Sequence, residues 1–330
     1  MKYSIIVPVY NRPDEVDELL ESLTKQTLKD FEVIIVEDGS IKPCKDVCEK
    51  YANILDLHYY AKENSGPGQS RNYGAERSNG EWLIILDSDV VLPEGYLEAV
   101  EKSLASSTSI AAWGGPDAAH PSFTPVQKAI SYSMTSFFTT GGIRGGKAKL
   151  DKFYPRSFNM GIRRDVYLKL EGFTKMRFGE DIDFSYRIVE AGYMPRLFPD
   201  AWVWHKRRTD FRKFFRQVYN SGIARINLEK RHPGTMKLVH LLPTVFTLGV
   251  IGLQLITLIF AYACVPIILY SAIICIDSSI KNKSLWVGLL SIPAAFVQLM
   301  GYGFGFIESW WKRCVLKEDE FTAFEKNFYK

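Results

Sequence analysis

The sequence predicts an α/β protein with a doubly wound, mainly parallel sheet, followed by a helical membrane segment. Two observations predict this arrangement. Short apolar runs alternate with amphipathic stretches between residues 4 and 86, which is the pattern of strand–helix–strand crossovers. Residues 238–276 and 284–307 contain no Asp, Glu, Lys or Arg. Because a membrane span needs roughly 20 apolar residues, both runs are long enough to insert into a bilayer.

The elements of the N-terminal part follow from local patterns. A helix is expected to begin at Pro13, because proline suits the first helical position, and a second at Ser70. A weaker helical pattern covers 47–55. Strands are predicted where apolar residues run continuously or alternate, as in a buried sheet. These strands cover 4–9, 31–36, 57–60 and 83–86.

Polar side chains follow three of these predicted strands. Tyr10 and Asn11 follow the first strand, Asp38 follows the second, and Asp87 and Asp89 follow the strand at 83–86. Each group alone also fits an ordinary polar turn. Ligands of doubly wound sheets bind beyond the carboxyl ends of the strands, so three such ends in succession indicate a binding edge.

The segment Asp87-Ser88-Asp89 is the most informative of these strand ends. Two carboxylates beside a buried strand are costly unless a cation compensates them. A divalent cation with a phosphate ligand would do so, because hard metals bind carboxylate and phosphate oxygens. The sequence contains neither GxxxxGK[ST] nor GxGxxG, which argues against a P-loop and against a Rossmann dinucleotide site.

Four motifs in this order resemble the inverting family 2 glycosyltransferases of GT-A fold, and the resemblance covers residues 3–210. The motifs are Pro8-Val9-Tyr10-Asn11, Val36-Glu37-Asp38-Gly39-Ser40, Asn64-Ser65-Gly66-Pro67 with Arg71-Asn72, and Asp87-Ser88-Asp89. The resemblance implies a mixed sheet with a mainly parallel N-terminal half. It also implies a nucleotide-sugar donor and Mn2+ or Mg2+ carried by Asp89 together with Asp87. Nucleotide-sugar contacts are expected from Pro8, Val9, Tyr10, Asn11, Asp38, Arg71, Asp87 and Ser88.

A second acidic motif lies at Glu180 and Asp181, where a helix is expected to begin. Acidic residues at a helix start also serve as ordinary N-terminal acids. By the resemblance, Asp181 takes the position of the catalytic base, and Glu180 orients the acceptor or the loop. An inverting transfer needs one carboxylate to deprotonate the acceptor hydroxyl. His205 follows a short predicted strand. It is either a third metal ligand or phosphate contact, or a partly exposed histidine.

A glycine-rich segment, 139–146, has four glycines in eight residues. It is interpreted either as a surface loop or as a lid on the acceptor side, in which Arg144 would meet an anionic phosphate.

The composition limits the partners. A formal charge of +4 and a pI near 8.6 do not indicate a nucleic-acid surface, and no nucleic-acid partner is expected. Met1 to Val7 does not look like a signal peptide, so the N-terminal part is expected in the cytosol. The five cysteines form no disulfide framework.

The expected organisation is a catalytic domain (1–210), an amphipathic juxtamembrane linker (211–237), two or three transmembrane helices (238–307) and a polar tail (308–330). Cations before residue 238 favour a cytoplasmic catalytic domain on a multi-pass protein of the inner or plasma membrane. Lys281 and Lys283 lie between the apolar runs, and Lys312 and Arg313 follow the second. These two clusters cannot both be cytosolic if the second run crosses once.

The sequence therefore predicts a membrane-anchored glycosyltransferase that moves one sugar to a lipid-linked or other glycan acceptor. Processive members of the family carry Gln-x-x-Arg-Trp, whereas Gln217 is followed here by Val218-Tyr219-Asn220-Ser221. A processive polysaccharide synthase and a catalytically degenerate membrane scaffold stay open as alternatives.

Overall fold

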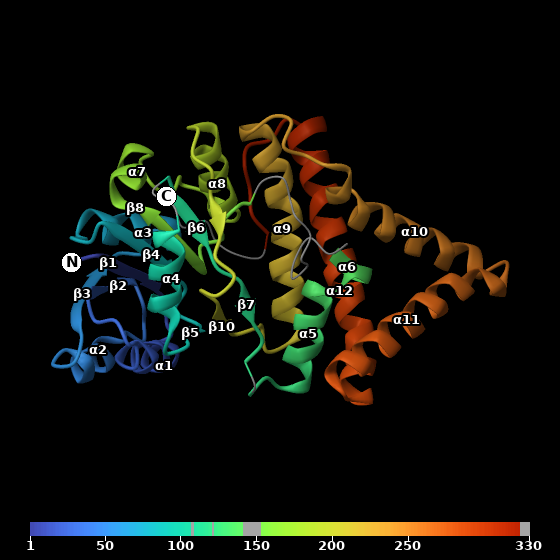
Figure 1. The fold of residues 1–330 in the computed structure, drawn as a ribbon. Coiled ribbons are helices and arrows are strands. Elements are labelled where there is room, and N and C mark those ends of the chain that lie inside the picture. The colour runs from blue at the N-terminus through green and yellow to red at the C-terminus, as the bar shows by residue number, and fades with distance from the viewer. Residues whose placement is uncertain (107–108, 121, 141–152, 324–330) are drawn as a thin grey trace. The chain divides into compact units, whose positions relative to one another are not determined.

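A computed structural model describes residues 1–106, 109–120, 122–140 and 153–323 (Figure 1). The chain divides into two compact units. Among the described residues, the first, here called the sheet unit, comprises 1–120 (without 107–108) and 153–206, and the second, the helical unit, comprises 122–140 and 207–323. The sheet unit is therefore interrupted in sequence by a segment that packs with the C-terminal helices.

The sheet unit contains a seven-stranded sheet in the order β3-β2-β1-β4-β8-β6-β9 and a three-stranded sheet in the order β5-β10-β7. The strands are β1 (Tyr3–Val9), β2 (Phe31–Asp38), β3 (Asp56–Lys62), β4 (Trp82–Leu86), β5 (Val90–Val91), β6 (Ala112–Gly114), β7 (Asp117–Ala118), β8 (Asn159–Arg163), β9 (Arg196–Leu197) and β10 (Val203–His205). The helices are α1 (Pro13–Thr24), α2 (Lys45–Tyr51), α3 (Pro67–Glu76), α4 (Tyr96–Ala105), α7 (Arg164–Lys169) and α8 (Glu180–Glu190).

The prediction of a doubly wound mixed sheet with a mainly parallel N-terminal half is confirmed. Strand β1 pairs in parallel with β2 on one side and with β4 on the other, and β2 pairs in parallel with β3. Strand β8, which the sequence did not predict, lies antiparallel between β4 and β6. The helix expected over 47–55 ends earlier, at Tyr51, because a turn follows it and β3 begins at Asp56.

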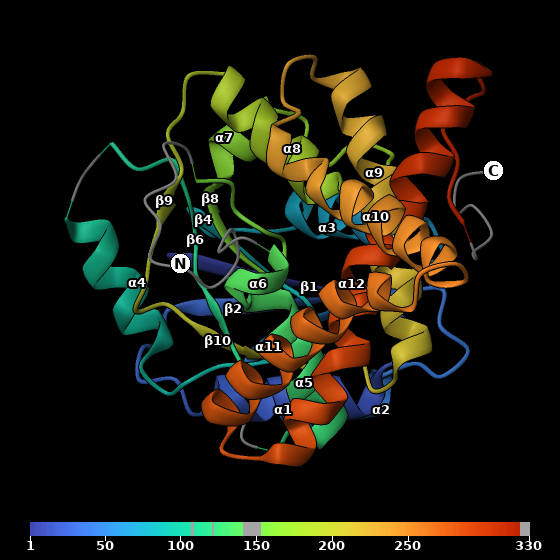
Figure 2. The same cartoon turned by 90° about the vertical axis from the view of Figure 1, so that its right-hand side faces the viewer.

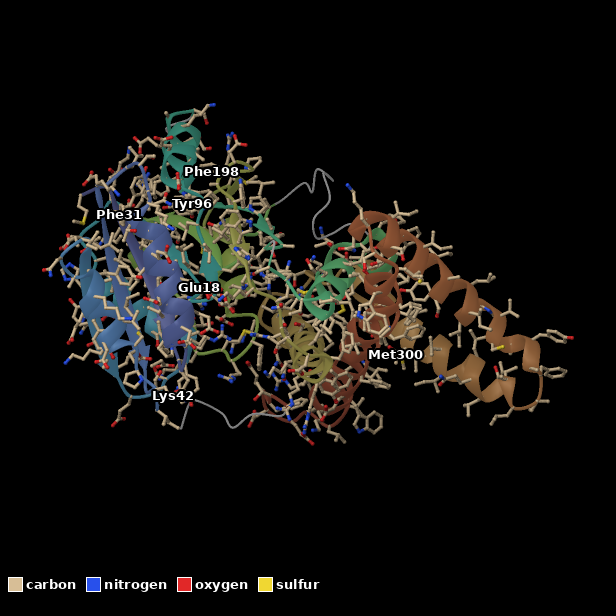
Figure 3. All side chains as sticks on the ribbon, turned by 90° about the horizontal axis from the view of Figure 1, so that it is seen from below. Glu18, Phe31, Lys42, Tyr96, Phe198 and Met300 are labelled. Carbon is tan, nitrogen blue, oxygen red and sulfur yellow. The ribbon has the colours of Figure 1, made fainter. Side chains whose placement is uncertain are left out.

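Helices cover the sheet because its central strands are apolar on both faces. All five residues of β4 are buried, and β1 is buried except for one partly exposed position. One core cluster contains Phe31, Tyr96 and Phe198, which are labelled in Figure 3. The polar residues at the strand ends are thus attached to a closely packed support.

The helical unit contains α5 (Pro125–Thr135), α6 (Phe137–Thr140), α9 (Phe211–Arg231), α10 (Leu242–Thr257), α11 (Val265–Asn282) and α12 (Leu285–Trp310). Figure 2 looks onto its apolar helices from the end at which α10 and α11 join. Three helical segments of the described chain are long and apolar enough to cross a membrane: Leu238–Thr257, Ala261–Asn282 and Leu285–Val315.

Helices α9 and α12 pack closely because both carry glycines at their contact. A side chain at Gly222 of α9 would meet the backbone of α12 at Tyr302, and one at Gly305 of α12 would meet the carbonyl of Tyr219. Further along, the Ser309 hydroxyl donates to the Ile223 carbonyl at 3.2 Å. The apolar face of α9 therefore lies on α12 over several turns.

Replacing Gly305 by alanine should destabilise the helical unit, because the added methyl group has no space beside the Tyr219 carbonyl. We expect a loss of about 1–3 kcal/mol, the usual cost of overpacking. Gly252→Ala is the matched control, since no atom lies within 4 Å of a methyl group there. Thermal unfolding in detergent checks this, and equal melting temperatures for the two variants would contradict the packing.

Candidate functional site

The polar residues predicted from the strand ends gather at one edge of the larger sheet. Strand β1 lies between β2 and β4. The strand order therefore continues to one side of β1 with β2 and β3, and to the other side with β4. In doubly wound sheets this switch in strand order opens a crevice at the carboxyl ends of the strands. Residues after β1, β2 and β4 therefore face a common region, which is the candidate site.

The loops after β1 and β2 are held together by Asn11. Its side-chain oxygen accepts hydrogen bonds from the backbone of Ile41 (2.7 Å) and Lys42 (2.9 Å), and its backbone N–H donates to the Ser40 hydroxyl (2.7 Å). Asn11 has a φ of 55°, a left-handed conformation that asparagine tolerates better than most residues. The preceding Tyr10 is half exposed. This leaves an aromatic side chain accessible above an ordered loop.

Pro8 and Val9, also predicted as nucleotide contacts, lie within β1, opposite Val36 and Glu37 of β2. Val9 is buried in the core. Its side chain therefore serves packing, and the exposed continuation of the strand begins at Tyr10.

Asp38 orders the loop that leads into α3. Its carboxylate accepts hydrogen bonds from the backbone N–H groups of Ser65 and Gly66, both at 2.9 Å, and it pairs with the ammonium group of Lys62. Both carboxylate oxygens thus have partners within the protein. Lys62 was not predicted as a site residue, because a lysine at the end of a strand has no distinctive sequence signal.

Asp87, Asp89 and His205 form a cluster in which the potential ligand atoms all lie within 4.8 Å of one another. The Nε2 atom of His205 is 3.2 Å from Asp89 Oδ1. The pairing of β10 with β5 places His205 there, opposite Val90. Two carboxylates and an imidazole are suitable ligands for Mn2+ or Mg2+, so this donor set fits the predicted metal. Ser88, between the two aspartates, is buried.

A second cluster of Glu32, Asp56 and His58 also has metal-like spacing. Glu32 Oε1 accepts hydrogen bonds from the Ser4 hydroxyl and the Asn79 backbone N–H, both at 2.6 Å, and Oε2 accepts from the Asn79 side chain at 3.2 Å. Glu32 and Asp56 stand near the starts of β2 and β3, at the opposite edge of the sheet from the candidate site.

Two arginines compensate the carboxylates at the strand end. Arg12 donates to Asp89 Oδ2 at 2.5 Å. Arg71, which is 3% exposed, donates to Asp87 at 2.8 Å and to Glu180 at 3.1 Å. Arg71 therefore connects the strand-end acids to the acidic motif of α8. The sequence indicated Arg71 but not Arg12.

Glu180 and Asp181 begin α8, as predicted, after Gly179 with a φ of 87°. The Nε atom of Arg156 donates to Asp181 Oδ2 at 2.5 Å, and Asp181 Oδ1 accepts from the backbone of Ile182 at 2.9 Å. Both acids are buried. Arg156 is the contact that sequence reasoning missed, because a single arginine in a loop gives no local signal.

The two acids have different electrostatic surroundings. Burial raises the pKa of Glu180 to about 7, since the favourable field of Arg71 does not offset desolvation and the Asp181 charge. Burial also disfavours the ionised form of Asp181, but the Arg156 guanidinium outweighs it and holds the pKa of Asp181 below its usual value. At neutral pH Asp181 is therefore ionised and can accept a proton, whereas Glu180 titrates.

The glycine-rich lid predicted at 139–146 falls mostly outside the described residues, and so does Arg144. Within the described chain, Thr139 lies in α6 of the helical unit.

Comparison with known proteins identifies a family. A family model described as "Glycosyl transferase family 2" matches residues 4–170, just over half of the chain. An uncharacterized glycosyltransferase of Haemophilus influenzae is 33% identical over 193 residues, which cover 57% of this chain and 62% of that protein. The poly(ribitol-phosphate) β-N-acetylglucosaminyltransferase TarS of Staphylococcus aureus is 41% identical over 93 residues, 27% of this chain and 16% of that one. The match thus spans less than two thirds of these relatives.

A solved structure shares the fold over most of the chain. The mannosyltransferase PcManGT of Pyrobaculum calidifontis, in complex with GDP-Man and Mn2+, matches with a TM-score of 0.62 and 18% identity. The match covers 90% of this chain and 87% of that one. At this identity the likeness concerns the fold, and it agrees with the GT-A resemblance drawn from the sequence.

Asp89→Asn should weaken Mn2+ binding by roughly tenfold or more, because one carboxylate ligand is lost from the cluster. Asp56→Asn, in the second cluster, is the matched control and should leave the affinity unchanged. Electron paramagnetic resonance of free Mn2+ during titration measures both. If the Asp56 variant loses binding and the Asp89 variant keeps it, the metal has been assigned to the wrong cluster.

The raised pKa of Glu180 should make stability depend on pH. Between the usual glutamate pKa of 4.5 and about 7, the folded protein holds a proton that the unfolded chain has lost. The free energy of unfolding should therefore fall as pH rises through this window. A difference of one bound proton changes the free energy of unfolding by about 1.4 kcal/mol per pH unit. Glutamine does not titrate, so the free energy of unfolding of Glu180→Gln should rise relative to wild type by on the order of 2 kcal/mol between pH 5 and pH 8.

Chemical unfolding at a series of pH values measures this difference. Glu98→Gln, at an exposed position of α4, is the control and should follow the wild-type profile. Parallel profiles for wild type and Glu180→Gln would contradict the assignment.

Proposed function

The chain belongs to glycosyltransferase family 2, and we propose that it transfers one sugar from a nucleotide-sugar to an acceptor with inversion at the anomeric carbon. The observation that carries this proposal is the meeting of two acidic motifs through one buried arginine. Arg71 contacts Asp87, on the side proposed for the donor, and Glu180, beside the proposed base. The residues proposed to bind the donor and those proposed to activate the acceptor are thereby connected within the sheet unit.

We propose that the donor lies across the carboxyl ends of β1, β2 and β4. The nucleobase and ribose would contact the segment from Pro8 to Asn11 and the region of Asp38, with Arg71, Asp87 and Ser88 on the nucleotide side. Tyr10 is half exposed and could stack on a base. The fold relative that holds GDP-Man and Mn2+ supports a donor of this class.

Asp89, with Asp87 and His205, would hold Mn2+ or Mg2+. When bound, the cation acts as a Lewis acid that neutralises the charge developing on the departing diphosphate. Arg12 and Arg71 contribute positive charge at the same carboxylates. These residues bind and orient the donor, while the acceptor is activated at α8.

Asp181 is the proposed general base. It takes the proton of the acceptor hydroxyl, whose oxygen forms a bond to the anomeric carbon as the bond from that carbon to the diphosphate oxygen breaks. Its lowered pKa keeps it ionised before the reaction. Arg156 fixes its orientation, and Glu180 positions the surrounding groups through Arg71.

We further propose that the acceptor is a lipid-linked or other glycan presented at the cytoplasmic face of the inner or plasma membrane. The apolar helices of the helical unit support attachment to a bilayer. A nucleotide-sugar from the cytosol would then meet an acceptor confined to the membrane surface.

Asp181→Asn should lower kcat by about 10²–10⁴-fold, because the acceptor proton loses its base. The substitution keeps the shape of the side chain and an oxygen that accepts from Arg156. Nucleotide-sugars are first screened for protection against thermal unfolding, which grows with ligand concentration over Kd and identifies the donor. Transfer is then measured with that donor, and the length of the product separates single transfer from polymerisation.

The control is Asp165→Asn, which changes an exposed aspartate of α7. It should retain normal turnover, and both variants should retain thermal protection by the donor. Near-normal turnover by a folded Asp181→Asn protein would rule out this base.

A further inference from the structure

The three apolar helices are alike in hydropathy but differ in their surroundings. In the most apolar windows of α10 and α11, 11% of residues are buried, compared with 39% for α12. Outward-facing side chains of α10 and α11, such as Leu255 and Ile268, are about half exposed or more. Helices α10 and α11 therefore present apolar surface outward, whereas α12 is covered by protein over a larger share of its surface.

The C-terminal half of α12 packs along α9. The Ser309 hydroxyl donates to the Ile223 carbonyl, and one turn further along Arg313 donates to the Asn227 side chain at 3.1 Å. The two ends of α9 expose a series of cations that cannot lie in hydrocarbon without large cost. These exposed cations are Arg212, Lys213, Arg216, Lys230 and Arg231.

The N-terminal half of α12 also has polar groups beside it. Ser278 of α11 is hydrogen-bonded to Ser291 of α12 at 2.6 Å. Asp277, the residue before Ser278, accepts a hydrogen bond from the Tyr132 hydroxyl of α5 at 2.6 Å and another from Lys281 at 2.8 Å. The last turns of α11 thus carry charged groups, and they lie beside the first turns of α12.

Helices α10 and α11 contact α12 at different ends. Thr247 of α10 lies at Gly303, whereas Ser279 of α11 lies at Gly288. The rings of Phe246, Tyr270 and Phe296 meet between these points, with centroids 5.2–5.9 Å apart. Beyond them the two helices leave α12 on the same side and join at their tip, as Figures 1 and 2 show. Helix α12 therefore runs across the base of a hairpin.

The tip of this hairpin is apolar. Leu258, Ile259 and Tyr262 are each about 80% exposed or more, and the turn carries no charge. Its backbone is largely satisfied internally, since Phe260 donates to Ile256 at 2.8 Å and Ala263 to Phe260 at 2.9 Å. Lipid tolerates such a turn, because its polar backbone groups are paired.

The hairpin is somewhat shorter than the bilayer core is thick. Helix α10 begins at Leu242, and fifteen residues lead from there to Thr257. At about 1.5 Å per residue they extend roughly 22 Å, which is less than the roughly 30 Å of bilayer hydrocarbon.

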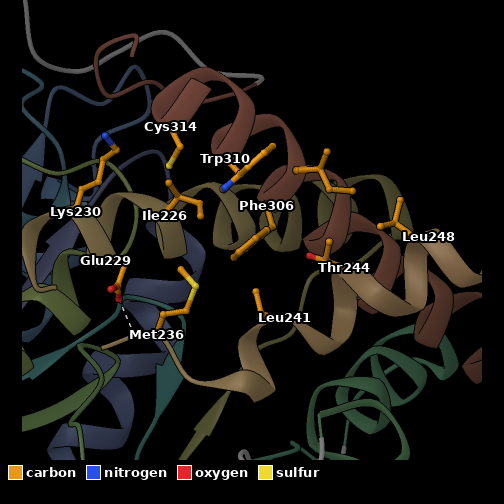
Figure 4. Close-up of a pocket in the computed structure, with 11 residues that line it drawn as sticks. Ile226, Glu229, Lys230, Met236, Leu241, Thr244, Leu248, Phe306, Trp310 and Cys314 are labelled. Carbon is orange, nitrogen blue, oxygen red and sulfur yellow. Dashed lines mark hydrogen bonds between the residues drawn. The ribbon is translucent and has the colours of Figure 1, made fainter. Parts of the chain in front are cut away.

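A groove between α9, α10 and α12 has a charged end and an apolar end. It has a volume of about 550 Å³, and Glu229 and Lys230 line one end while Leu248 lines the other (Figure 4). The transition from charged to apolar lining occurs along the first turns of α10. This is the polarity change expected where a helix enters a membrane.

From these contacts we propose that the helical unit is a monotopic membrane anchor. The hairpin α10–α11 enters one leaflet and returns, and α12 lies at the membrane surface as its base. The sequence predicted two or three spans, because hydropathy does not reveal that α12 is covered by α9 and α5. In this arrangement the cations before α10, between α11 and α12, and after α12 all remain on one side. The positive-inside conflict between Lys283 and Arg313 thereby disappears.

Cysteine accessibility tests this topology in the full-length protein. Single-cysteine variants are made by retaining Cys264 or Cys314, or by introducing Lys102→Cys or Lys283→Cys, with the remaining cysteines changed to alanine. A membrane-impermeant maleimide is applied to spheroplasts and to inverted vesicles of a bacterial host. Lys102, on α4, reports the side of the sheet unit.

We expect positions 102, 283 and 314 to react in inverted vesicles only, and Cys264 to react only after denaturation in detergent. Labelling of positions 283 and 314 from opposite faces would show that α12 crosses and would overturn the proposal. Labelling of Cys264 in spheroplasts would overturn it as well, because the hairpin would then span the bilayer. Release of the chain by alkaline carbonate would exclude any insertion. None of these outcomes depends on glycosyl transfer.

Discussion

Compensation of closely spaced carboxylates is the constraint on which the candidate site depends. Asp87, Asp89, Glu180 and Asp181 are largely withdrawn from water, where unpaired charges would be costly. Each has a guanidinium partner from a different segment of the chain: Arg71, Arg12 or Arg156. These contacts hold the start of α8 against the strand-end loops. The same charge arrangement separates the two acids of α8 into one that is ionised at neutral pH and one that titrates there.

Much of the sheet unit could be predicted because its determinants are local. Continuous apolar runs predicted β1, β2 and β4, and the polar residues at their carboxyl ends indicated the candidate site. Strand β8 escaped prediction, because it is short and exists only through pairing with β4 and β6. The ion-pair partners escaped for a similar reason. Arg12 and Arg156 are isolated arginines in loops, and only the folded chain places them beside Asp89 and Asp181.

The membrane part shows a different limit of sequence reasoning. Hydropathy identifies helices that are apolar enough to insert into a membrane. Whether such a helix stays exposed also depends on which other helices cover it. By composition alone, Gly301, Gly303 and Gly305 make α12 a less apolar span than α10 or α11. In the fold, Gly301 and Gly305 admit α9 and Gly303 admits α10. The glycines thus mark a helix that packs against its neighbours, whereas α10 and α11 leave most of their apolar surface exposed.

The central claim is that the strand-end acids hold a cation and the diphosphate of a donor. The most direct measurement is anomalous X-ray diffraction from crystals grown with Mn2+ and a nucleoside diphosphate. The account predicts a manganese peak beside Asp89 that is also ligated by diphosphate oxygens. A nucleotide bound without manganese at Asp89, or a manganese peak only at Glu32, Asp56 and His58, would contradict it.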